Sequence, residues 1–142
     1  MEKKTTVKSI EINAPVSKVW EAITDPVSIR NWAAAFGHGT HADSEWKAGS
    51  IIEWKDMGGN VGAKGIITRM DECEQLKVDF FDDFKLSNPE DLGEYSEIYD
   101  LSGDDERTTL KVTIGPIEER YVKSFDTMWD RAMINIKNLC EN

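Results

Sequence analysis

The spacing of apolar residues changes along the chain, and each change predicts a different kind of element. Residues 5–13 alternate weakly between apolar and polar positions around Val7, Ile10 and Ile12, which favours a first β-strand. The next apolar residues recur every three or four positions, as they do on one side of a helix. They are Val16, Val19, Trp20 and Ile23.

Two prolines predict that this helical region is divided into two short helices. Pro15 suits the first turn of a helix, where a missing N–H costs nothing. The first helix is expected to end at Thr24, because residues before a proline disfavour the helical conformation. Asp25 can cap a second helix that has Pro26 at its first position. Its apolar side would consist of Val27, Ile29 and Trp32.

From Trp46 onward the pattern changes to short extended segments separated by glycine-containing and acidic turns. Leu76, Val78 and Phe80 alternate with polar Lys77 and Asp79, which is typical of a strand with one dry face and one wet face. Consecutive segments of this kind favour antiparallel pairing. The predicted strands cover residues 50–56, 63–70, 76–81, 94–101 and 108–115, with a weaker strand over 41–46.

The last segment, residues 117–139, has the strongest helical pattern in the chain. Glu118 and Glu119 complement the positive end of its dipole, and it contains no glycine or proline. The apolar positions are Val122, Phe125, Met128, Trp129, Ala132, Met133, Ile136 and Cys140. The order of elements therefore predicts an α+β domain, with helices gathered on one side of an antiparallel sheet.

Composition narrows the possible functions. The 142 residues suit one domain, and no apolar run approaches the length of a membrane span. The N-terminus has lysines without an apolar stretch after them, so we expect no signal peptide and a cytosolic location. A net charge of -10 would repel nucleic acid and anionic membranes, so neither is an expected partner.

Residues able to hold metals or act as nucleophiles form no complete pattern. Cys73 and Cys140 lie far apart, which excludes CxxC sites and favours two reduced thiols. His38, His41 and Asp43 are close in sequence, but a catalytic zinc normally needs three convergent ligands with supporting contacts, and a flexible loop explains them better. We therefore expect no metal, no cofactor and no covalent catalysis.

Three segments resemble one family. Residues 10–32, IEINAPVSKVWEAITDPVSIRNW, contain the pattern A-P-x-x-x-V-W-x-A-(I/L)-T-x-P. This pattern resembles the START-like (SRPBCC) superfamily, in the bacterial branch named after the activator of the heat-shock-protein-90 ATPase. Residues 62–80 and 99–114 are similar to two hairpin segments of that branch. Residues 82–93 form a longer, more acidic connection than the branch implies, which favours a solvated loop, with a lid as the alternative.

The resemblance implies a helix-grip fold over residues 1–142: a curved antiparallel sheet of six or seven strands wrapped around the C-terminal helix. The two short helices would close one end of the interior, with Trp32 and Phe36 near its entrance. An apolar pocket of ~500 Å³ would cost ~12 kcal/mol if left empty, so we expect it to hold a ligand, water or collapsed side chains. Simple core packing is the alternative for each candidate wall residue: Trp32, Phe36, Trp54, Phe80, Tyr99, Met128, Trp129 and Met133.

Three charged residues, Glu53, Arg69 and Glu97, lie within otherwise apolar strand segments. Any of them that points inward would need a partner, and a buried carboxylate could serve as a general acid or base. They are therefore candidates for a polar part of the pocket. A position on the outer, wet face is the alternative for each.

These features favour a binding protein rather than an enzyme. It would hold a hydrophobic or amphipathic small molecule, such as a lipid, between the sheet and the C-terminal helix. The first alternative is an enzyme resembling polyketide cyclases or dehydratases that uses the same pocket. The second is regulation of a chaperone ATPase by protein–protein contact, which rests on the branch name. The sequence leaves the oligomeric state open.

Overall fold

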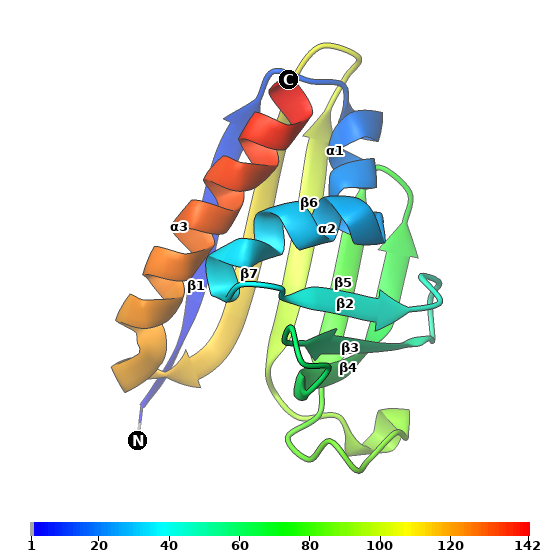
Figure 1. Ribbon diagram of the computed structural model, residues 1–142, viewed down its shortest axis with the longest axis vertical. Helices are drawn as coiled ribbons and strands as arrows, with labels where there is room; N and C mark the ends of the chain where they lie inside the picture. The colour runs from blue at the N-terminus through cyan, green and yellow to red at the C-terminus, as the bar shows by residue number, and fades with distance from the viewer. Residues whose placement is uncertain (1) are drawn as a thin grey trace.

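Seven strands form one antiparallel sheet in the computed structural model, which describes residues 2–142 (Figure 1). Their order across the sheet is β1-β7-β6-β5-β4-β3-β2, so β1 and β2 are the two edges. The strands are β1 (Lys3–Ile12), β2 (His41–Ser44), β3 (Ile51–Lys55), β4 (Val61–Asp71), β5 (Gln75–Phe80), β6 (Ser96–Gly103) and β7 (Thr108–Glu118). The predicted α+β class is confirmed.

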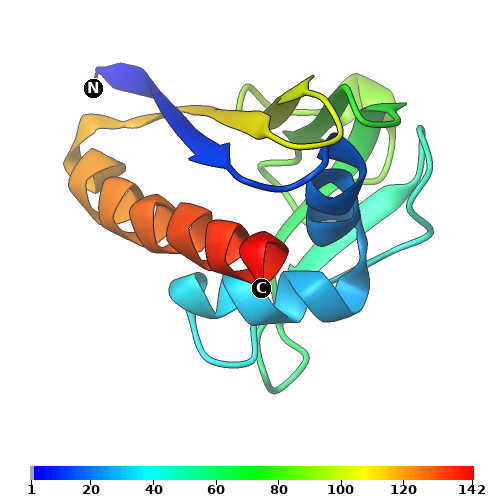
Figure 2. The ribbon, with the colours of Figure 1, turned by 90° about the horizontal axis from the view of Figure 1, so that it is seen from above.

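The helices lie together on one side of the bent sheet (Figure 2). The long C-terminal helix runs along the sheet, and the short helices after β1 pack against it. This is the helix-grip arrangement that the resemblance implied. The helices are α1 (Val16–Thr24), α2 (Pro26–Trp32) and α3 (Glu119–Glu141), with 3₁₀ turns η1 (Ala33–Phe36) and η2 (Pro89–Asp91).

The break between α1 and α2 forms as the two prolines predict. The Asp25 carboxylate accepts hydrogen bonds from the backbone N–H and the hydroxyl of Ser28, both at 3.0 Å, which caps α2. The indole N–H of Trp32 donates to the carbonyl of Ala22 at 2.8 Å and ties the end of α2 back to α1. Because the chain changes direction between α1 and α2, α2 and η1 lie against α3. A single straight helix would have continued past α3.

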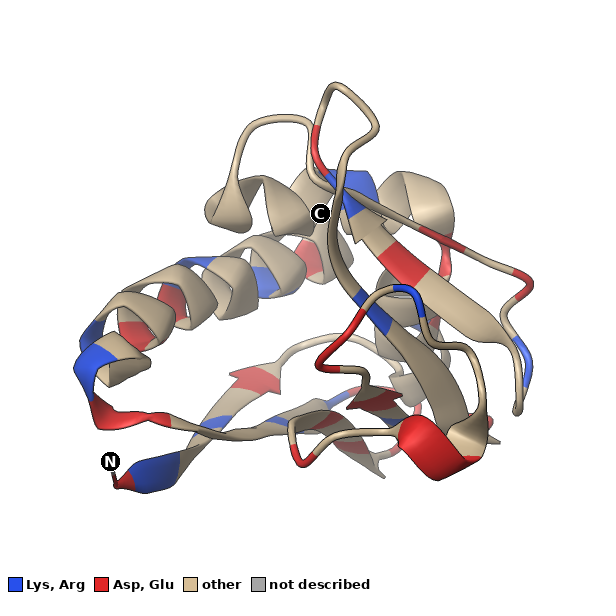
Figure 3. Cartoon of the chain, turned by 90° about the horizontal axis from the view of Figure 1, so that it is seen from below, with Lys and Arg blue, Asp and Glu red and all other residues tan. Residues whose placement is uncertain are grey.

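The two ends of α3 pack differently against the rest of the protein. The buried residues of the helix begin at Trp129, next to its midpoint, and continue to its C-terminal end: Trp129, Ala132, Met133, Ile136 and Cys140. Acidic and basic residues are interspersed along α3 (Figure 3), and Lys8 Nζ of edge strand β1 lies 3.3 Å from Asp126 Oδ1 and 2.9 Å from Asp130 Oδ1. The N-terminal half is therefore held to β1 by charge while its apolar side stays partly open.

The predicted start of the last helix, at residue 117, is wrong by two positions. Ile117 and Glu118 belong to β7, where they pair with Lys4 and Lys3 of β1. Sheet pairing over these residues outcompetes their helical pattern, so α3 begins at Glu119.

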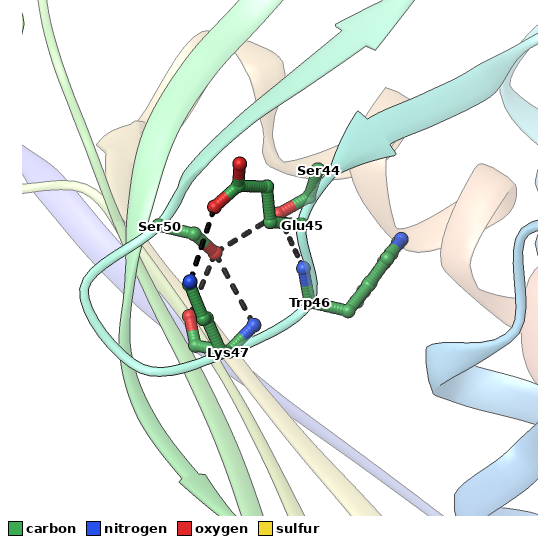
Figure 4. Close-up of polar contacts among 5 residues, drawn as sticks. All are labelled: Ser44, Glu45, Trp46, Lys47 and Ser50. Carbon is green, nitrogen blue, oxygen red and sulfur yellow. Dashed lines mark hydrogen bonds and ion pairs between the residues drawn. The ribbon is translucent and has the colours of Figure 1, made fainter.

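The turn between β2 and β3 also differs from the prediction, because β2 ends at Ser44 and not at residue 46. Trp46 has a positive φ of 55°, which a strand cannot contain. Figure 4 shows the polar contacts that hold this turn: the Ser50 hydroxyl donates to the Lys47 carbonyl at 2.7 Å, and Ser44 Oγ accepts from the Trp46 N–H at 3.1 Å. The turn fixes the start of β3, which carries Trp54.

No helix within residues 2–142 is long and apolar enough to cross a membrane.

Candidate ligand-binding cavity

A cavity of about 200 Å³ lies between the N-terminal half of α3, η1 and the inner face of the sheet. The strands that supply its floor are β3, β4, β5 and β6, and the wall opposite comes from α2, η1 and α3. The lining residues are Trp32, Phe36, Thr40, Trp54, Ala63, Phe80, Tyr95, Glu97, Tyr99, Phe125, Met128 and Trp129.

Aromatic rings make up most of this lining, and Trp129 stands at their centre. Its ring centroid lies 5.0 Å from that of Phe36, 6.0 Å from that of Tyr99 and 6.4 Å from that of Trp32. Edge-to-face and tilted contacts of this kind stabilise aromatic pairs and hold each ring in one orientation. The walls are therefore built of rings that support one another around the open space.

A second aromatic group lines the opposite side. The Tyr95 ring lies 5.2 Å from Phe80 on β5 and 6.4 Å from Phe125 on α3, measured between centroids. Tyr95 thus bridges from the sheet to the helix across one side of the cavity.

Seven of the eight predicted wall residues border this cavity. Met133 does not: it is 4% exposed and lies one helical turn beyond Trp129, where α3 packs closely on the sheet. Trp32 borders the cavity but is not near an entrance, because it is 1% exposed and its N–H is bonded to Ala22. That these residues bind a ligand stays a prediction.

Glu97 is the only charged residue in the lining that residues 2–142 provide. It lies on β6 between Val78 of β5 and Ile114 of β7, both buried, and it faces the same side of the sheet as Tyr99. Glu97 keeps some accessible surface because it borders the cavity, yet the surrounding wall is almost entirely apolar.

Two tyrosine hydroxyls bind the Glu97 carboxyl. Tyr95 Oη donates to Oε2 at 2.9 Å, and Tyr99 Oη donates to Oε1 at 3.1 Å. Burial raises the pKa of the Glu97 carboxyl to about 7, and the two hydrogen bonds lower it only in part. Burial and the adjacent carboxylate hold the pKa of both tyrosines well above the usual range, so they act as donors.

The structure places Arg69 outside the cavity. Strict alternation from Ile67 would turn Arg69 inward, but β4 has a bulge between Ile67 and Arg69. The extra residue turns Met70 inward and Arg69 outward, where its side chain is 61% exposed and bonded to Asp71 at 2.6 Å.

Glu53 also lies outside the cavity. Its neighbours Ile52 and Trp54 face inward, so the period of two turns Glu53 to the outer face of β3. There it stands between Asp43 of β2 and Lys64 of β4, with Lys55 Nζ at 3.9 Å. Of the three charged candidates, the structure brings only Glu97 to the aromatic residues.

The short histidine segment makes local contacts. His41 Nδ1 lies 2.9 Å from the Gly39 carbonyl, and Asp43 pairs with Lys55 at 2.7 Å. Within residues 2–142 there is no group of three or more histidine, cysteine or acidic residues that could hold a metal ion. Cys73 and Cys140 are both free thiols.

Residues 82–93 form an exposed loop and contribute nothing to the cavity lining. Lys64 anchors the loop from outside the sheet: its Nζ donates to the Phe84 carbonyl at 3.1 Å and to the Ser87 hydroxyl at 2.9 Å. This placement agrees with a solvated loop and not with a lid.

Four lining residues were missing from the predicted site: Thr40, Ala63, Tyr95 and Phe125. Tyr95 and Phe125 carry a usable signal. Tyr95 stands two residues before Glu97 and four before Tyr99, the spacing of one strand face, and Phe125 precedes Trp129 by one helical turn. Ala63 and Thr40 carry none, because small residues become lining only through what the fold places beside them.

Together, the fold and the cavity define a helix-grip domain with a partly open, largely aromatic cavity. This chain belongs to the family described as Activator of Hsp90 ATPase homolog 1-like protein, whose profile matches residues 13–141. The resemblance seen in the sequence is thereby confirmed. A comparison with curated protein sequences finds no match.

Several solved structures share the fold. MLL2253 from Mesorhizobium loti is 16% identical with a TM-score of 0.75, over 96% of each chain. The Aha1 dimer from Colwellia psychrerythraea is 16% identical with a TM-score of 0.72, over 97% of this chain and 96% of that one. ChR145 from Cytophaga hutchinsonii is 27% identical with a TM-score of 0.71, over 100% and 97%.

Proposed function

We propose that this protein binds a small hydrophobic or amphipathic molecule in the cavity between α3 and the sheet. The observation that carries the proposal is the form of the interior: about 200 Å³ of open space, walled by aromatic rings, with one carboxyl group at its surface. Ligand sites in proteins combine these features, an apolar concave wall and a few convergent polar groups. The proposed setting is the cytosol.

The energy of the cavity supports an occupant. An apolar void costs roughly 24 cal/mol per Å³, so about 200 Å³ left empty of both water and ligand would cost about 5 kcal/mol. That is comparable to the lower end of the stability of a typical domain, about 5 to 15 kcal/mol. An engineered void of ~150 Å³ admits benzene, so a guest with one ring suits this cavity.

Ligand-induced stabilisation tests the proposal. Indole and 2-phenylethanol are suitable single-ring probes, and thermal unfolding is followed with and without each. A probe at a hundredfold excess over its dissociation constant stabilises the protein by ~2.7 kcal/mol. Native mass spectrometry of freshly purified protein provides an independent readout, a molecule that co-purifies.

A matched pair of variants locates the effect. Ala63→Phe adds a ring inside the cavity and is expected to abolish stabilisation by the probes. Val27→Phe adds a ring on α2 at a side chain that is 77% exposed, and is expected to leave it unchanged. If the probes stabilise both variants equally, binding must occur elsewhere. If no single-ring probe stabilises the unaltered protein, the proposal is wrong.

The state of Glu97 favours an enzyme as the second candidate. A carboxyl with a pKa of about 7 is suited to general acid–base catalysis near neutral pH. In this reading the pocket holds an apolar, polyketide-like substrate for a cyclase or dehydratase reaction, and Glu97 transfers the proton. Product formation that is lost in Glu97→Gln and retained in Glu53→Gln would support it, whereas binding without turnover favours the first proposal.

Contact with a chaperone is the third candidate, and the family description is what favours it. This candidate function predicts that the protein associates with purified heat-shock protein 90 and still does so when a side chain fills the cavity. Ala63→Phe is therefore expected to retain that association, and loss of association in this variant alone would argue against a separate contact surface.

A further inference from the structure

The electrostatic environment of Glu97 suggests a narrower class of ligand. Its hydrogen bonds within residues 2–142 come from two tyrosines, and the part of the cavity lining that these residues form includes no lysine, arginine or histidine. A buried carboxylate without a cationic partner is unfavourable. A proton or a positively charged guest would remove that cost.

The rings around Glu97 provide the second observation. Eight of the twelve lining residues are aromatic, and the two that bond to the Glu97 carboxyl, Tyr95 and Tyr99, have rings that can make cation–π contacts. Such rings attract a positive charge within about 6 Å of their centroids, more strongly when water is excluded. Purely hydrophobic guests would use the rings but leave the carboxylate uncompensated.

We propose that the cavity selects a small organic cation, with a positively charged nitrogen at Glu97 and an apolar group against the rings of Trp32, Trp54 and Trp129. This inference rests on the proposed function and names its ligand class. A primary amine donates hydrogen bonds to the carboxylate oxygens, each of which retains a free lone pair beside its tyrosine hydroxyl. The net charge of -10 also raises the local concentration of cations around the protein.

Protonation of Glu97 opposes the same cation. The other titratable groups facing Glu97 are Tyr95 and Tyr99, while β5, β7 and α3 present apolar side chains to it. With a Glu97 pKa of about 7, the ionised fraction falls about thirtyfold between pH 8 and pH 5.5. An alkyl amine keeps its charge over this range, so its affinity is expected to fall by about the same factor on acidification.

Calorimetric titration with two probes of matched shape tests the proposal: 2-phenylethylamine, which is positively charged, and 2-phenylethanol, which is neutral. At pH 8 the amine is expected to bind at least about tenfold more tightly than the alcohol, as one favourable charge contact of about 1.4 kcal/mol would give. At pH 5.5 the preference is expected to disappear. The pH comparison uses the unaltered chain and so does not depend on the folding of a variant.

Two variants assign the preference to Glu97. Glu97→Gln is expected to bind both probes equally at pH 8, and Glu53→Gln, with its change on the outer face, is expected to keep the preference. Equal binding of amine and alcohol by the unaltered protein, or a preference that survives Glu97→Gln, would overturn this inference while leaving the binding function intact. Binding of neither probe would remove both.

Discussion

Replacing Glu97 with glutamine is expected to remove a large part of the pH dependence of folding stability above pH 4.5. In the folded protein, burial raises the pKa of this carboxyl to about 7, against an ordinary value of 4.5. Between these pH values the folded chain holds a proton that the unfolded chain has lost. Stability must then fall as pH rises, because the unfolded state binds fewer protons.

The size of the effect follows from the same two values. The contribution of Glu97 to the free energy of unfolding is fully present below pH 4.5 and is lost as pH rises through about 7. At about 1.36 kcal/mol for each pH unit, the loss amounts to about 3 kcal/mol. Glutamine fills a similar volume without a charge, so Glu97→Gln is expected to be more stable than the unaltered protein at pH 8.

Urea denaturation at intervals from pH 4.5 to pH 8 measures this difference. Acidic groups elsewhere contribute to the absolute stability of both proteins, so the informative quantity is the free energy of unfolding of the variant minus that of the unaltered protein. Glu53→Gln is the control, because its carboxylate lies outside the cavity and its removal is expected to leave the pH profile unchanged. Parallel profiles for Glu97→Gln and the unaltered protein would refute the reasoning.

Three further substitutions, and a control for one of them, test contacts that hold the fold together, each by urea denaturation. Trp32→Phe removes the 2.8 Å hydrogen bond to the Ala22 carbonyl and part of a buried ring, and is expected to cost about 2–4 kcal/mol; a loss below about 1 kcal/mol would contradict the proposed tie between α1 and α2. Gly65→Ala places a methyl group against the backbone carbonyl of Asp79 on β5, and is expected to cost about 1–3 kcal/mol. Gly62→Ala is its control on the same strand, since the nearest atom there is 3.9 Å away, and equal costs for the two variants would exclude this steric cause. Lys8→Met leaves Asp126 and Asp130 facing each other without a cation and is expected to cost about 1 kcal/mol, less at high salt; insensitivity to salt would argue against a charge effect.

Regular periodicity explains why most of the fold could be predicted. The stripe from Phe125 to Cys140 has the period of a helix throughout, and alternation along β5 and β7 places their apolar residues on one face. The two prolines define the short helices because each acts through its own ring geometry. Such signals depend on local chain geometry and need no knowledge of distant partners.

The predictions failed where a distant contact decides the outcome. Ile117 continues β7 because β1 offers it a partner, and Arg69 faces outward because a bulge shifts the alternation of β4. The position of Met133 beyond the cavity likewise depends on where α3 approaches the sheet. Thr40 and Ala63 border the open space only because larger neighbours surround it.

Indole N–H signals provide the most direct test of a ligand-binding cavity. Among the five tryptophans, Trp32, Trp54 and Trp129 line the cavity, whereas Trp20 and Trp46 lie elsewhere. In ¹H–¹⁵N spectra recorded during titration with 2-phenylethanol and then with 2-phenylethylamine, we expect the first three indole signals to shift with at least one probe and the other two to stay in place. Five unmoved signals, or shifts confined to Trp20 and Trp46, would contradict binding in this cavity.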